Sequence, residues 1–127
     1  IAGNFVDEVV LGSLEFACKV AGSKAIVILG HTHCGAVKGA VDYVELGNLT
    51  AMLDNIEPAV EAVKDIKVNR TSKNDEFVQK VADMHVNLTI ERLMRDSDVL
   101  REMHEKGEIA IVGAMYDVET GKVVFTD

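Results

Sequence analysis

Apolar residues recur three or four positions apart along most of this chain. Such spacing predicts helices that each bury one face against a core. Gly22 would end the first helix, and Pro58 would either kink the third or begin a new first turn within it. The helices are expected over residues 7–21, 36–45 and 49–66, over a long segment with Phe77, Val81, Met84 and Leu88 on one face, and from Ser97 to Gly107.

Polar residues mark the boundaries of the later helices. Residues 67–74 are polar and are expected to form a loop. Ser72 and Asp75 at its end resemble a capping box for the long helix that follows. Ser97 is a second candidate cap, and it would open the last helix.

Two stretches are continuously apolar instead, at residues 24–29 and 109–116. Runs without polar alternation fit strands that are covered on both faces, and we expect the two to be neighbours in one sheet. Residues 119–122 predict a hairpin turn into a return strand at 123–125. The order of elements predicts an α/β fold, a mostly parallel sheet flanked by helices, in a single domain over residues 1–127.

Composition narrows the classes of function. The formal net charge is −8, which argues against nucleic acid or an anionic membrane as a partner. No stretch is long and apolar enough to span a bilayer. The two cysteines do not resemble a disulfide pair, so a reducing, cytoplasmic compartment is expected. No signal peptide is visible, and because the chain opens on IAGNFV without an initiator methionine, a trimmed product, with or without a lost leader, is left open.

The candidate chemistry follows the first apolar run directly. That run ends in Gly30, and His31 and Cys34 come next, three residues apart. Imidazole and thiolate are ligand types that zinc prefers, and α/β proteins place their sites at the carboxyl ends of strands. The glycines around them, with Lys38, match neither common phosphate-binding motif. Spacing alone leaves open a metal site, a buried pair without metal, and a Cys34 nucleophile activated by His31.

The remaining histidines and cysteine have simpler interpretations. His33 lies between the two candidate ligands and is expected to pack or to point to solvent. His85 and His104 fall on polar or mixed helix faces and are expected to be structural or exposed. Cys18 occupies an apolar helix position and is expected in the core.

Five segments, in order and over essentially the whole chain, resemble β-class carbonic anhydrases. They are AGN at 2–4, GSLEFA at 12–17, GHTHCGAVKGA at 30–40, SDVLREM at 97–103 and IVGAMYDVETGKV at 111–123. The resemblance implies zinc-dependent reversible hydration of CO2 to bicarbonate. It also implies that His31 and Cys34 are the family's second and third protein ligands to zinc.

The resemblance also implies what the chain does not contain. The family's first zinc ligand is a cysteine in a C-x-D-x-R segment whose Asp and Arg form a pair beside the metal, and this sequence has no such segment. We therefore expect a C-terminal part of such an enzyme, lacking the N-terminal helices and first strand. No catalytic residue beyond the two metal ligands is expected in these residues.

Two further expectations concern assembly and activity. The resembled family forms homodimers or higher homo-oligomers, and bare sheet edges predict that this chain is not a stable monomer. With only two zinc ligands, these residues alone are expected to have no appreciable CO2 hydration activity. The alternative function is an inactive fragment, or a structural or association module, of the same fold.

Overall fold

A three-stranded sheet organises the computed structural model, which describes residues 1–126. β1 (Ala25–His31) pairs in parallel with β2 (Ala110–Tyr116), and β2 pairs antiparallel with β3 (Val123–Thr126). The predicted pairing of the two apolar runs and the predicted hairpin are confirmed. The α/β class is confirmed as well, and the described strands form a mixed sheet with one parallel and one antiparallel pair.

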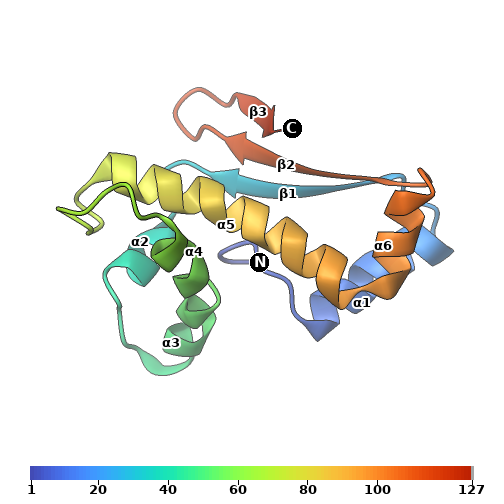
Figure 1. Ribbon diagram of the computed structural model, residues 1–127, viewed down its shortest axis with the longest axis horizontal. Coiled ribbons are helices and arrows are strands. Elements are labelled where there is room, and N and C mark those ends of the chain that lie inside the picture. Colours follow the sequence, from blue (N-terminus) through green and yellow to red (C-terminus); the bar gives the residue numbers. More distant parts are fainter. Residues whose placement is uncertain (127) are drawn as a thin grey trace.

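The helices gather on one side of this sheet (Figure 1). The longest, α5 (Asp75–Asp96), runs along β1 and β2, and its first half and second half contribute to two different clusters of buried apolar residues. The other helical elements are α1 (Glu8–Glu15), the π-helix η1 (Phe16–Val20), α2 (Gly35–Val41), α3 (Gly47–Asp54), α4 (Glu57–Ala62) and α6 (Asp98–Glu105). Within residues 1–126, no helix combines the length and apolarity needed to cross a membrane.

The one-sided arrangement corrects one prediction about β1. Burial alternates along this strand, so that Ile26 and Ile28 are buried while Val27 and Leu29 are 44% and 46% exposed. We expected both faces of the strand to be covered because its sequence is uniformly apolar. Among the described residues, helices cover only the face that carries Ile26 and Ile28. The opposite face of β1 is apolar and open.

The segment predicted as one helix at 49–66 forms two helices instead. Pro58 lies in the first turn of α4, which confirms the prediction of a new first turn. The helix ends at Ala62 because Val63 is extended, with a ψ of 100°. Similarly, α2 stops at Val41, before the predicted residue 45, and Tyr43 just beyond it has a positive φ of 53°.

The predicted capping residues have different outcomes. Ser97 caps α6, since its Oγ accepts a hydrogen bond from the Leu100 N–H at 3.2 Å. The cap of α5 is Asn74, and the prediction of Ser72 was wrong. The Ser72 backbone N–H and hydroxyl both donate to the carboxylate of Asp42, which holds the pKa of that carboxyl below its usual range.

Candidate metal centre

The segment with both candidate ligands joins the carboxyl end of β1 to the first turn of α2. His31 is the last residue of β1 and is exposed, whereas Cys34 immediately precedes α2 and is only 5% exposed. Gly30 allows the end of β1 to approach its neighbours closely. A Cβ at this position would lie 2.9 Å from Val86 Cγ2 on α5 and 2.8 Å from Met115 Cε on β2.

The His31 ring is held by the chain's own backbone. Its Nδ1 lies 2.8 Å from the carbonyl oxygen of Thr32. Since a carbonyl oxygen only accepts hydrogen bonds, the network assigns the proton of the neutral ring to Nδ1. The lone pair of Nε2 is then available to a metal, and a backbone carbonyl is a usual partner for the other nitrogen of a metal-binding histidine.

The hairpin between β2 and β3 contacts this segment at three points. The Thr32 N–H donates to the Tyr116 carbonyl at 2.9 Å, and the Val118 N–H donates to Thr32 Oγ1 at 3.1 Å. His33 Nε2 lies 3.2 Å from Glu119 Oε1. His33 was expected to pack or to point to solvent. It is 43% exposed at the side chain and joins the hairpin, a contact across 86 residues that no local sequence pattern could signal.

The donor atoms present fit zinc in kind but not in number. Imidazole nitrogen and cysteine sulfur are standard zinc ligands, and a catalytic site uses three protein ligands. Among residues 1–126, no cluster of three or more His, Cys, Asp or Glu side chains could hold a metal ion. Among the described residues, His31 and Cys34 are therefore two donors of the kinds that zinc uses, one fewer than a catalytic zinc site needs.

The other residues of reactive types lie elsewhere. Cys18 is buried in η1, as predicted, and burial raises the pKa of its thiol. His104 is exposed on α6. His85 is buried on α5, and its Nε2 pairs with the carbonyl of Gly3, so it fastens the N-terminal segment to the long helix. Burial lowers the pKa of His85, and the bond to Gly3 partly opposes this.

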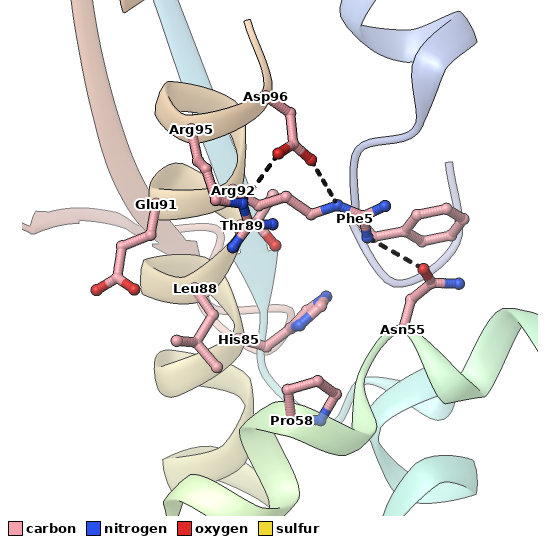
Figure 2. Close-up of a pocket in the computed structure, with 10 residues that line it drawn as sticks. All are labelled: Phe5, Asn55, Pro58, His85, Leu88, Thr89, Glu91, Arg92, Arg95 and Asp96. Atoms are coloured by element: carbon pink, nitrogen blue, oxygen red, sulfur yellow. Dashed lines mark hydrogen bonds and ion pairs between the residues drawn. The ribbon is translucent and has the colours of Figure 1, made fainter.

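His85 also lines a cavity of about 290 Å³ between α5, the start of α4 and the N-terminal segment (Figure 2). Arg92 spans this cavity, donating to Asn55 Oδ1 at 3.2 Å and to Asp96 Oδ2 at 3.4 Å. Arg95 donates to the second oxygen of Asp96 at 2.9 Å. These arginines are matched by acceptors, and no residue of the 31–35 segment lines the cavity. Sequence reasoning did not single out Arg92 or Asn55.

Comparisons with known proteins address the family directly. Residues 1–123 match the family model described as "Carbonic anhydrase". Carbonic anhydrase 2 of Mycobacterium tuberculosis is 36% identical over 128 residues, which cover 99% of this chain and 60% of that protein. Carbonic anhydrase of Mycolicibacterium smegmatis is 33% identical, with 96% of this chain and 58% of that protein covered. The chain therefore spans about three fifths of these relatives' length.

Solved structures agree with the sequence comparisons. The β-carbonic anhydrase CafA of Aspergillus fumigatus superposes with a TM-score of 0.79 at 28% identity, over 99% of this chain and 61% of that one. A Coccomyxa β-carbonic anhydrase shares the fold, with a TM-score of 0.84 at 19% identity, over 98% and 57% of the two chains. Sequence match, relatives and fold agree, and the chain belongs to the β-carbonic anhydrase family.

Proposed function

We propose that this chain is part of a zinc enzyme that hydrates CO2 reversibly to bicarbonate, with His31 and Cys34 as two of the metal ligands. The observation that carries this proposal is their placement in a member of this family. An imidazole with an accessible Nε2 and a cysteine sulfur lie on one short turn at the carboxyl end of β1.

Each residue of the turn has a role in this proposal. His31 would bind zinc through Nε2, while its Nδ1–H donates to the Thr32 carbonyl and fixes the ring. Cys34 would bind as the thiolate, so metal binding releases its proton. Zinc, when bound, supplies a Lewis acid that makes water acidic enough to attack CO2 near neutral pH.

The remaining donor would come from outside the described residues. In the family that this chain resembles, that donor is the cysteine of a C-x-D-x-R segment, and its Asp–Arg pair lies beside the metal. The exposed position of His31 leaves room for such a segment to approach. Residues 1–127 alone would then be inactive, because two protein ligands do not make a catalytic zinc site.

We further propose that the protein acts as a homodimer or larger homo-oligomer. Three apolar side chains are exposed at helical spacing along α1 and η1: Val9 is 76%, Phe16 is 61% and Val20 is 71% exposed. The open face of β1 adds Val27 and Leu29. Exposed apolar surface of this kind is typical of an interface. The two cysteines are free, which supports a cytoplasmic location.

One observation favours a second function, an inactive structural or association module. Among the described residues, His31 and Cys34 have no third metal-binding side chain near them. Such a module would need neither zinc nor turnover, and its open apolar faces would serve assembly alone.

Zinc content and stopped-flow CO2 hydration of the full-length protein distinguish the two functions. We expect zinc and activity in the full-length protein without substitutions, the parent protein, and loss of both in His31→Ala and Cys34→Ser. His104→Ala and Cys18→Ala are matched controls, because they remove an exposed histidine and a buried cysteine elsewhere in the fold and should keep both properties. A folded parent protein without zinc or turnover would favour the module. Full activity in Cys34→Ser would refute its role as a ligand.

A further inference from the structure

We propose that Thr32 is a positioning residue for His31, and that its hydroxyl anchors it to the hairpin between β2 and β3. This inference rests on the proposed function only where it concerns zinc. Thr32 uses three groups at once: its carbonyl accepts from His31 Nδ1, its N–H donates to Tyr116, and its Oγ1 accepts from Val118.

The hydroxyl matters because the strand pairing ends immediately before Thr32. The parallel register of β1 and β2 stops at His31 opposite Tyr116. Beyond that pair, the chain turns toward α2, and His33 takes a positive φ of 54°. The bond from the Val118 N–H to Thr32 Oγ1 adds one contact beyond the pairing, at 3.1 Å, and ties the Thr32 side chain, and with it the Cα that carries the carbonyl, to the hairpin.

The orientation of that peptide decides which nitrogen of His31 can bind a metal. The Thr32 carbonyl holds the proton of the neutral ring on Nδ1, so the Nε2 lone pair remains free. An exposed imidazole without such a partner exchanges its proton between the two nitrogens in water. A rotated Thr32 carbonyl would therefore leave part of the His31 population in the wrong tautomer and with a mobile ring.

The tautomer can be measured without any metal. Nitrogen-15 NMR of histidine-labelled, metal-free protein at about pH 8.5, where histidine is neutral, reports which ring nitrogen carries the proton. His31→Ala assigns the His31 signals. We expect the Nδ1–H form in the full-length parent protein and in Thr32→Ser, which keeps the hydroxyl. We expect a mixture of both tautomers in Thr32→Val, which keeps the branched shape but removes the hydroxyl.

Thr120→Val is the matched control. Thr120 Oγ1 accepts a backbone hydrogen bond from Lys122 at 3.3 Å within the same hairpin, and this bond involves no residue of the ligand segment. The control should keep the parent tautomer. Thermal melting tests whether Thr32→Val folds. If it does not, Thr32→Ala takes the place of Thr32→Val in every comparison, because it removes the same hydroxyl without adding an apolar methyl group.

Zinc affinity, measured by competition with a chelator, gives the second readout. We expect Thr32→Val to bind zinc about 10–100-fold more weakly, as is usual when a partner of a metal ligand is lost. Thr32→Ser and Thr120→Val should stay within about threefold of the parent protein, a margin small against that loss. An unchanged tautomer and zinc affinity in Thr32→Val, or the Nε2–H form in the parent protein, would overturn the positioning role. A hydroxyl-dependent tautomer in a parent protein that binds no zinc would support that role and overturn the proposed function.

Discussion

Arg70 should be one of the most sensitive surface positions for stability, because its side chain holds the segment that follows α4. Its guanidinium donates to three backbone carbonyls, those of Val60 at 2.9 Å, Val63 at 2.6 Å and Ile66 at 2.7 Å. It also lies over the Phe77 ring, 4.5 Å from the centroid. The end of α4 thus depends on a residue in the following loop.

Arg70→Met keeps most of the apolar stem and removes all of these interactions. A hydrogen bond to a charged group contributes about 1.5–3 kcal/mol when its partner stays buried. Because this site is half-buried and the carbonyls can return to water, we take about 1 kcal/mol for each, and about 0.5–1 kcal/mol for the contact with Phe77. The expected loss in the free energy of unfolding is about 3.5–4 kcal/mol.

Urea unfolding followed by far-UV circular dichroism measures this loss. The free energy of unfolding of Arg70→Lys should lie between those of the unsubstituted protein and Arg70→Met. The lysine ammonium keeps the charge but cannot donate to three carbonyls as the planar guanidinium does. Arg95→Met is the control, since that side chain is 69% exposed and forms a surface ion pair with Asp96, so we expect a change within about 0.5 kcal/mol. A loss below about 1 kcal/mol in Arg70→Met would show that water replaces the guanidinium at these carbonyls, and our reasoning would be wrong.

Three further changes test other parts of the fold. Burial lowers the pKa of His85 and favours its neutral form in the folded protein. The free energy of unfolding should therefore be highest above about pH 6.5 and decrease as the pH falls below it. Urea unfolding at several pH values should show a smaller decrease in His85→Gln. Gly30→Ala should destabilise the folded protein by about 1–3 kcal/mol, because the new Cβ would lie 2.9 Å from Val86. Thermal melting measures this loss, with Gly12→Ala as the control because a Cβ at Gly12 would have no atom within 4 Å. Ser97→Ala should lower the free energy of unfolding in urea by about 1–2 kcal/mol, since Ser97 caps α6 and donates to Glu15 at 2.8 Å. A loss no larger than that of Ser13→Ala, at an exposed serine, would refute this.

The parts of the fold that sequence predicted depend on interactions between near neighbours. Ser97 caps the helix that begins one residue later, and Gly107, with a φ of 72°, ends it. The hairpin at 119–122 closes through a bond from the Gly121 N–H to the Asp117 carbonyl, four residues away. Patterns of a few residues suffice where the deciding contact lies within that range.

Two outcomes that local patterns could not decide involve partners far away in the sequence. Ser72 has the right residue type for a cap, but Asp42, 30 residues earlier, takes both its hydroxyl and its N–H. Asn74 then caps α5. His85 was expected to be structural or exposed, and its bond to Gly3, 82 residues earlier, makes it structural, which its mixed helix face alone could not decide. Local pattern cannot rank two capping residues when a third, distant side chain decides between them.

The candidate metal site and the open face of β1 are linked by the geometry of a strand. Alternate residues of a strand share one face, so His31 lies on the same face as the exposed Val27 and Leu29. Any segment or second copy that covers these apolar side chains must therefore approach the His31 imidazole. Under the proposed function, the segment or copy that completes the zinc site would also cover this face of β1, which would account for an exposed histidine at the end of a half-exposed apolar strand.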